Sequence, residues 1–380
     1  MLLEKLSNNI DAKKYLKELG VDGGGVNILA SKISHHLIYI RDLHVGAANI
    51  LKQDALSVGA DLAVPKGTIL AATPKVNCIL IATTSQLKVL SKKELAQPFG
   101  LKELAKKLSE ILKVKKSSSV EIMGVLNAND DSFFSQSRFT SAQAIGKIET
   151  MIDDGADIID IGGASSAPNS KRVETEEELQ RVKPILKMIK EQKLYERVKF
   201  SIDSYEPLVV KEALESGFKI VNDITGLAND DICRLSAEYK AQAVIMHMQG
   251  TPQTMQKEPK YEHLLCDIYD FFKQRILKAE SFGVKDIMLD VGIGFGKTLN
   301  HNLDLIKHLE HFLTLQKPLL IGASRKSMID KISASQPKDR LSGTISLHLE
   351  AIRNGASIIR VHDVAEHVQA IKIQQALDAR

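Results

Sequence analysis

The chain has 380 residues, of which 44% are hydrophobic and 26% charged, the composition of a globular protein large enough for two domains. Its formal net charge is +4, and no Lys/Arg run with interleaved aromatic residues indicates a nucleic-acid partner. No apolar stretch reaches the roughly 18 residues of a membrane span. The start of the chain lacks the apolar run of a secretory signal, so we expect a cytoplasmic protein without a membrane partner.

The first 118 residues are predicted to form a small α+β domain. They carry 18 basic and 10 acidic side chains, which is more typical of a solvated surface than of a nucleic-acid platform. The expected elements are an extended run at 36–40, a helix at 47–58, an extended run at 78–83 and a Lys-rich helix at 102–113. The Lys- and Ser-rich segment 113–119 marks the boundary, which gives domains 1–118 and 119–380. Nothing in residues 1–118 indicates their function.

After the boundary, short runs rich in Ile and Val alternate with longer segments of helical periodicity, which indicates repeated βα units. The predicted strands are 121–127, 157–162, 198–204, 219–224, 243–248, 286–291, 318–324 and 357–363. Eight strands with seven linking helical segments and a final helix from Ala365 favour a closed (β/α)8 TIM barrel. An open doubly wound sheet is the alternative, but the dinucleotide motif Gly-x-Gly-x-x-Gly does not follow the first strand.

The segment Asp290-Val-Gly-Ile-Gly-Phe-Gly-Lys-Thr298 superficially matches a phosphate-binding P-loop. That loop needs Gly, four residues, and then Gly-Lys-Thr, and here Val291 stands at the first position. We therefore interpret the segment as a strand that ends in an acidic residue, followed by a glycine-rich turn.

Polar side chains stand at the ends of most predicted strands. They are Asn127, Asp203, Asn222, Asp290, Lys326, Arg360 and His362. Each alone has a simpler explanation, since Asp and Asn often cap the next helix. So many polar groups at one barrel rim are costly without a polar ligand, however, because buried polar groups need partners.

The types of these residues indicate the ligand chemistry. Carboxylates such as Asp203 and Asp290 suit the hydrogen-bonding edge of an aminopyrimidine ring. Arg360 and His362 alternate on one strand and therefore share a face, which suits a phosphate group. Asn127 offers a neutral oxygen to Mg2+. His367 follows His362 by five residues, but no third ligand supports a zinc site.

Over residues 120–375, the chain closely resembles the dihydropteroate synthases. The matching motifs are Met123-Gly-Val-Leu-Asn127, Ile158-Ile-Asp-Ile-Gly-Gly163, Ser201-Ile-Asp-Ser204, Val221-Asn-Asp-Ile224, Met246-His-Met-Gln-Gly250 with Pro252, Met255 and Gln256, Asp290–Thr298, Ser324-Arg-Lys-Ser327 and Arg360-Val-His-Asp363. The resemblance implies a (β/α)8 barrel, usually a homodimer. It also implies an enzyme that joins a pterin pyrophosphate to p-aminobenzoate with loss of pyrophosphate, in folate biosynthesis.

The resemblance also implies roles for individual residues. Asp290, Lys326 and Asp130 are expected to be catalytic. The pterin would be held by Asp203, Asn222, Asp290, Lys326, Met246 and Arg360; the p-aminobenzoate pocket would contain Ser166, Pro168, Phe295 and Ser327. Arg360 and His362 would bind pyrophosphate, and Asn127 would contact the Mg2+ cofactor.

Three segments depart from the family pattern. The first loop reads Asn127-Ala-Asn-Asp-Asp-Ser-Phe133, where the family has Val, Thr and Pro after Asn. The second, Gly162-Gly-Ala-Ser-Ser-Ala-Pro-Asn169, lacks the usual Glu and Arg, and Val291 replaces a proline. These changes leave two alternatives: a non-catalytic pterin-binding protein and a pterin-dependent methyltransferase. The latter does not need the Ser-Arg-Lys-Ser and Arg-Val-His motifs.

Overall fold

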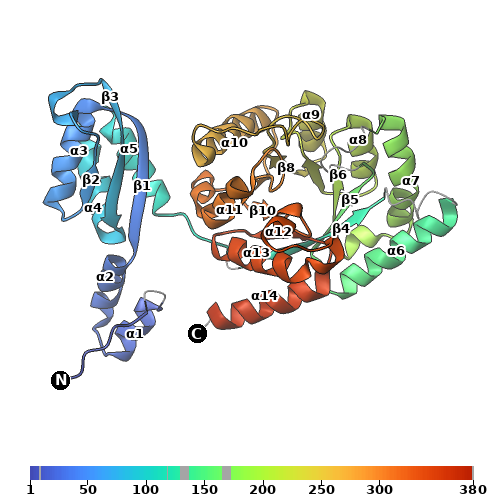
Figure 1. Ribbon diagram of the computed structural model, residues 1–380, viewed down its shortest axis with the longest axis horizontal. Coiled ribbons are helices and arrows are strands. Elements are labelled where there is room, and N and C mark those ends of the chain that lie inside the picture. Colours follow the sequence, from blue (N-terminus) through green and yellow to red (C-terminus); the bar gives the residue numbers. More distant parts are fainter. Residues whose placement is uncertain (8–9, 118, 129–136, 165–172, 379–380) are drawn as a thin grey trace. The chain divides into compact units, whose positions relative to one another are not determined.

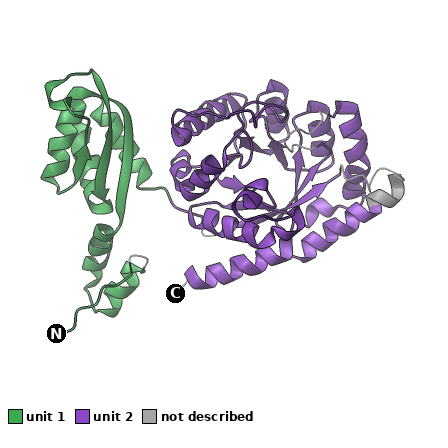
Figure 2. Ribbon diagram, viewed as in Figure 1, with its two compact units in different colours: residues 1–114 green, residues 115–380 purple. Residues whose placement is uncertain are grey.

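The computed structural model describes residues 1–7, 10–117, 119–128, 137–164 and 173–378. The chain divides after Val114 into two compact units (Figure 2). Unit 1 comprises residues 1–114, and unit 2 comprises residues 115–380.

Unit 1 is built on an antiparallel sheet in the order β1-β3-β2. Its strands are β1 (His35–His44), β2 (Asp61–Ala63) and β3 (Lys75–Thr83). Burial alternates along β3, with Cys78 and Leu80 buried and Ile79 and Ile81 exposed, because successive side chains of a strand face opposite sides. The buried side packs against α3 (Val45–Ser57), α4 (Thr84–Lys93) and α5 (Leu101–Ile111).

The predicted elements of unit 1 are present, but among its described residues the sequence pattern missed four α-helices or strands and two short 3-10 helices. The four are α1 (Ala12–Glu18), α2 (Gly23–Ile33), β2 and α4. Helix α4 follows β3 without a loop, because Thr83 and Gln86 form a capping box at the last strand residue. The signal was present in the sequence, because Thr83-Thr-Ser-Gln86 has the capping-box spacing that precedes a helix.

Unit 2 is a closed parallel barrel in the order β10-β11-β4-β5-β6-β7-β8-β9, which confirms the predicted fold. The strands are β4 (Glu121–Asn127), β5 (Ile158–Gly162), β6 (Lys199–Asp203), β7 (Ile220–Asp223), β8 (Gln242–Met246), β9 (Ile287–Asp290), β10 (Leu319–Ile321) and β11 (Ile358–Val361). Each observed strand lies within its predicted range or extends it by one residue. Most are shorter than predicted, at one or both ends.

Helices surround the barrel (Figure 1). They are α6 (Ser137–Asp153), α7 (Thr175–Glu191), α8 (Pro207–Glu215), α9 (Asp230–Glu238), α10 (Leu264–Ser281), α11 (Leu299–Lys307), α12 (Ser327–Ile332), α13 (Leu341–Arg353) and α14 (Val364–Asp378). Two of them, α12 and α13, connect β10 to β11. In the part of the chain that the structure describes, no helix combines the length and apolarity needed to cross a bilayer.

The inside of the barrel is filled by apolar side chains. This inner cluster consists of Met123, Ile158, Ile220, Val244, Met288, Leu320 and Ile358, all at most 2% exposed. A second and larger apolar layer lies between the strands and the helices. Because the interior is packed, a ligand can only bind at a mouth of the barrel, and the polar strand ends define which mouth.

Candidate active site

Strand register brings the predicted polar residues to one rim. Asp203 at the end of β6 pairs with Asn222 of β7, and Asp290 at the end of β9 pairs with Met246 of β8. On the other side of β6, Asp203 pairs with Gly162 of β5. All of these strands are parallel, so their carboxyl ends meet at one mouth, as the strand pattern predicted.

Arg360 crosses this mouth and joins two carboxylates. Its Nε donates to Asp160 Oδ2 at 2.7 Å, and one terminal nitrogen donates to Asp203 Oδ2 at 2.8 Å. Asn222 Nδ2 donates to the same oxygen of Asp160 at 3.0 Å. The predicted residues Arg360, Asp203 and Asn222 therefore belong to one hydrogen-bonded cluster.

Asp160 was not predicted to be a site residue. Its side chain is fully buried, and its Oδ1 has no hydrogen-bond partner among the described residues. The signal was present in the sequence, because Asp160 interrupts the apolar run Ile158-Ile-Asp-Ile161. A charged residue inside a buried strand needs a partner of opposite charge, and the sequence could not show that this partner lies on β11.

Burial and neighbouring charges shift the pKa values of Asp203 and Arg360 in opposite directions. Burial raises the pKa of Asp203, and the neighbouring Arg360 opposes that rise. Burial lowers the pKa of Arg360, but Asp160 and Asp203 outweigh it and hold that pKa above its ordinary value. Arg360 thus stays cationic, and it can give up a carboxylate partner to an incoming anionic ligand.

Lys326, in the loop after β10, lies next to the glycine-rich turn. Its Nζ donates to Ile293 O at 2.5 Å and lies 4.1 Å from the centroid of the Phe295 ring, a cation–π contact. Burial lowers the pKa of Lys326 to about 8, and Asp290 opposes this. Burial also raises the pKa of Asp290, whose Oδ1 accepts a hydrogen bond from Gly292 N.

Lys297 explains why the glycine-rich turn is not a P-loop. Its Nζ donates to His247 Nδ1, His247 O and Phe295 O at 3.0, 3.2 and 2.9 Å. These three acceptors match the three N–H groups of an ammonium ion, and Lys297 is only 2% exposed. Its amine is therefore engaged inside the protein and does not face a ligand phosphate.

Gly292 lets this turn pass close to the end of β8. It has φ +68°, and a Cβ atom at this position would lie 1.9 Å from His247 O. We predict that Gly292→Ala lowers the free energy of unfolding by about 3 kcal/mol or more, through backbone strain and overpacking. Chemical denaturation would measure this, with Gly146→Ala as the control, because a Cβ at Gly146 meets nothing within 4 Å. Equal stability of the two variants would contradict the expectation.

The loops that follow β10 and β11 are joined by side chains. Ser324 Oγ and His362 Nδ1 lie 2.9 Å apart, and Arg325 forms two hydrogen bonds to the carboxylate of Asp363. His362 keeps part of its surface open at the rim, while Ser324 covers its Nδ1 side. Desolvation, and then the positive charge of Arg360, lower the pKa of His362 to about 4, so an anion that reached this position would favour its protonation.

The remaining predicted residues are distributed as follows. Met246 is buried beside Asp290, whereas Ser327 is exposed at the start of α12. Asn127 is exposed at the end of β4. Asp130, Ser166 and Pro168 lie outside the described residues.

The site offers few protein ligands for a metal ion. Within the described ranges, no group of three or more His, Cys, Asp and Glu side chains could hold one. Mg2+ keeps several waters and takes other ligands from substrate phosphates, so a single exposed oxygen such as that of Asn127 fits its chemistry.

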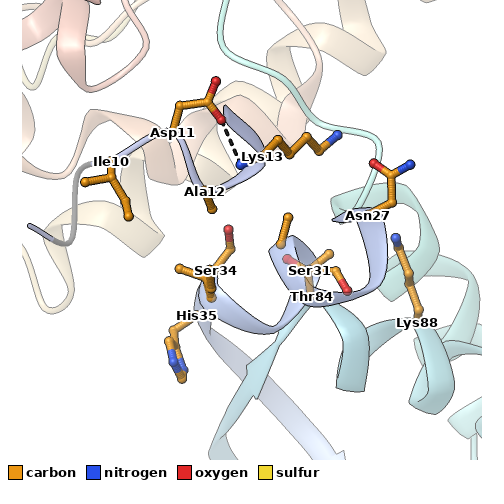
Figure 3. A pocket seen from close by; sticks show the side chains of 12 residues that line it. Ile10, Asp11, Ala12, Lys13, Asn27, Ser31, Ser34, His35, Thr84 and Lys88 are labelled. Carbon is orange, nitrogen blue, oxygen red and sulfur yellow. Dashed lines mark hydrogen bonds between the residues drawn. The ribbon is translucent and has the colours of Figure 1, made fainter. Parts of the chain in front are cut away.

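Unit 1 contains a separate cavity of about 1030 Å3. Figure 3 shows that its walls come from α1, α2, the start of β1 and α4. The polar residues that line it include Asp11, Lys13, Asn27, His35, Thr84 and Lys88. The sequence pattern did not predict this cavity, because α1, α2 and α4 were not recognised.

Comparison with known proteins agrees with this geometry. Residues 123–362 match the model of the family described as pterin binding enzyme. The dihydropteroate synthase of Escherichia coli K12 is 40% identical over 262 residues, which are 68% of this chain and 92% of that protein. A crystal structure of dihydropteroate synthase from Clostridium difficile, obtained in the presence of pteroic acid, is 39% identical with a TM-score of 0.64; it covers 69% of this chain and 98% of that one.

Some relatives match both units. The bifunctional dihydropteroate synthase/dihydropteroate reductase of Helicobacter pylori is 43% identical over 379 residues, covering 100% of this chain and 99% of that protein. Barrel, site and matches together define a pterin-binding transferase of folate biosynthesis. The chain belongs to the pterin binding enzymes and, among them, to the dihydropteroate synthases.

Proposed function

We propose that this chain joins 6-hydroxymethyl-7,8-dihydropterin pyrophosphate to p-aminobenzoate and releases pyrophosphate, in a reaction that depends on Mg2+. The observation that carries the proposal is the cluster in which Arg360 bridges Asp160 and Asp203 beside Asn222. It combines acceptors for the amino groups of a pterin with a cation for the leaving anion. A cytoplasmic homodimer is part of the same proposal.

Each group in the site has a physical task in this reaction. Asp203 and Asn222 would hold the aminopyrimidine edge, and Lys326 would contact the pterin from the side of Phe295 and Asp290. As the bond between the pterin methylene and the pyrophosphate oxygen breaks, positive charge develops on the methylene carbon, and Asp290 can stabilise it. A new bond then forms between this carbon and the amine nitrogen of p-aminobenzoate, and the proton lost from that nitrogen passes to the solvent.

The departing pyrophosphate needs compensation for its negative charge. Arg360 on β11 and His362 in the loop that follows it stand two residues apart, and would supply cationic donors. Mg2+ held by Asn127 and pyrophosphate would neutralise further charge. Ser166, Pro168, Phe295 and Ser327 are proposed to form the p-aminobenzoate pocket, with Asp130 acting in turnover.

Pyrophosphate release by the purified protein tests this function. We expect release that requires both substrates and stops when Mg2+ is chelated. Pterin binding without turnover would favour the non-catalytic alternative, and release in the absence of added divalent cations would contradict the proposed cofactor.

A second activity is proposed for unit 1. The E. coli relative matches only 68% of this chain, about the size of unit 2, and its name contains only the synthase. The H. pylori relative that matches the whole chain is also named as a dihydropteroate reductase. The E. coli match of 262 residues leaves out a stretch about as long as unit 1, and the family model begins only at Met123, so we propose that unit 1 takes part in reducing dihydropteroate.

The cavity of unit 1 is the candidate place for this step. Reduction adds a hydride and a proton across a C=N bond of the pterin, and no protein side chain donates hydride, so a reduced nicotinamide or flavin nucleotide must supply it. Lys13 and Lys88 of the cavity suit an anionic nucleotide. Reductase assays should show a several-fold loss in Lys88→Glu; the exposed Lys102 on α5 provides the control variant Lys102→Glu. Equal activities would exclude the cavity as the site.

A further inference from the structure

Two buried histidines connect the loops that follow β10 and β11. His348 of α13 and His367 of α14 are 0% and 1% exposed, and His348 Nδ1 lies 3.0 Å from His367 Nε2. At the outer ends of the pair, Ala323 N donates to His348 Nε2 at 3.1 Å, and His367 Nδ1 lies 2.6 Å from Asp363 O. A continuous chain of hydrogen bonds thus runs from one loop to the other.

Only one arrangement of protons satisfies every contact in this chain. Because Ala323 N is a donor, His348 Nε2 must be the acceptor, which places the His348 proton on Nδ1. His367 Nε2 then accepts that proton, and His367 Nδ1 must donate to Asp363 O. Both rings are neutral in this arrangement, and burial lowers the pKa of each. All four ring nitrogens are used.

The residues at the two ends of the chain adjoin proposed ligand-binding residues. Ala323 precedes Ser324, and Asp363 follows His362; Ser324 Oγ and His362 Nδ1 are themselves 2.9 Å apart. The loop after β10 leads on to Lys326. A displacement of either loop would therefore move groups that are proposed to contact the pterin and the pyrophosphate.

Helix α13 also holds the loop after β10 at a second point. Arg325 has φ +56°, a conformation that costs a non-glycine residue about 1 kcal/mol or more. Thr344 Oγ1 on α13 accepts from Arg325 N at 3.0 Å, and Arg340 donates to Arg325 O at 3.0 Å. A backbone conformation of this kind persists only where contacts with the surroundings impose it. Here the contacts come from Thr344 of α13 and from its N-cap residue Arg340.

We infer that His348 and His367 are positioning residues for the synthase reaction, which set the placement of Lys326 and His362 through the backbone of the two loops. They do not touch the substrates themselves. The inference rests on the proposed roles of Lys326 and His362. It predicts that loss of the pair weakens binding of pterin pyrophosphate more than it lowers turnover.

Substitutions can separate the two halves of the chain of hydrogen bonds. His348→Leu removes both contacts of His348, whereas His348→Gln can keep an acceptor near Ala323 N and lose the contact to His367. His367→Asn can still donate to Asp363 O. If the positions of the two loops determine binding, KM for pterin pyrophosphate in His348→Gln and in His367→Asn should lie between the values of the wild type and of His348→Leu.

The test is steady-state kinetics of the full-length variants, with thermal unfolding of each. His348→Leu should raise KM for pterin pyrophosphate about tenfold, as expected for one weakened charge-assisted contact, while kcat changes less. Asn354→Ala is the matched control: Asn354 is the C-cap of α13, and its Nδ2 donates to Ile306 O of α11 at 3.0 Å, not to either loop. This control should lose stability without a change in KM.

The outcomes separate failure of the inference from failure of the proposed function. A folded His348→Leu with wild-type KM would overturn the inference, and so would a rise in KM equal to that of Asn354→Ala. If His348→Leu does not fold, the Gln and Asn variants carry the same comparison. If the wild type shows no synthase activity, the affinity of the wild type and of His348→Gln for pyrophosphate is measured by calorimetry. A lower affinity of His348→Gln would support the positioning role, and equal affinities would overturn it.

Discussion

Arg360→Ala should abolish synthase activity and lower the free energy of unfolding by about 3–5 kcal/mol. The variant leaves the fully buried Asp160 and the neighbouring Asp203 without their cation. It also removes a proposed donor to the pyrophosphate. Chemical denaturation and pyrophosphate release measure the two losses separately.

The two effects of Arg360 can be separated further. Adding Asp160→Asn to Arg360→Ala should restore part of the stability, because the uncompensated buried charge is gone, without restoring activity. Arg197→Ala is the control, since Arg197 forms an exposed pair with Asp153 at 3.6 Å, and exposed pairs contribute about 0–1 kcal/mol. A stability loss in Arg360→Ala no larger than that of the control would show that the cluster is not held by this ion pair.

Lys326→Ala should raise KM for pterin pyrophosphate about a hundredfold, because it removes a partly buried cationic donor beside Asp290. The protein should remain folded, since the main contacts of Lys326 Nζ are one backbone carbonyl and the Phe295 ring. Lys331→Ala is the control, because Lys331 is exposed at the end of α12. A KM within about threefold of the wild-type value would show that Lys326 does not contribute to pterin binding.

The same lysine predicts a pH dependence of ligand binding. Its pKa is lowered from 10.5 to about 8, so the ligand-free protein loses this positive charge as the pH rises through 8. Pterin affinity should therefore fall above pH 8, by up to tenfold per pH unit. Lys326→Arg should not show this loss, because arginine stays protonated. Titrations of pterin binding between pH 7 and 10 compare the two proteins.

As the pH rises, this lysine should change the stability of the folded protein in the opposite direction to its effect on pterin affinity. Unfolded lysine keeps its proton up to about 10.5, so between pH 8 and 10.5 the unfolded chain binds more protons than the folded protein does. For this group alone, the folded protein gains stability as the pH rises through that range. Denaturation of the wild type and of Lys326→Ala over the same range would isolate this contribution.

Most of the barrel could be predicted from local patterns. The predicted ranges 121–127 and 286–291, for example, contain β4 and β9, because parallel strands are buried on both faces and read as continuous apolar runs. Unit 1 was predicted less completely, because α4 follows the last residue of β3, the capping residue Thr83, without an intervening turn. Helices α1 and α2 carry only one buried residue between them, so they lack the apolar periodicity that sequence patterns detect.

The sequence alone determined which residue types stand at the strand ends, and its motifs identified the family. The repeating βα pattern placed Asp203, Asn222, Asp290 and Lys326 at one rim, since parallel strands share one carboxyl edge. Only the tertiary structure decided how these groups are paired. Closure of the barrel brings Arg360 to Asp160, 200 residues away in the chain, and packing of α13 against α14 brings His348 to His367. Such pairs depend on distances across the fold, and local sequence patterns carry no information about those distances.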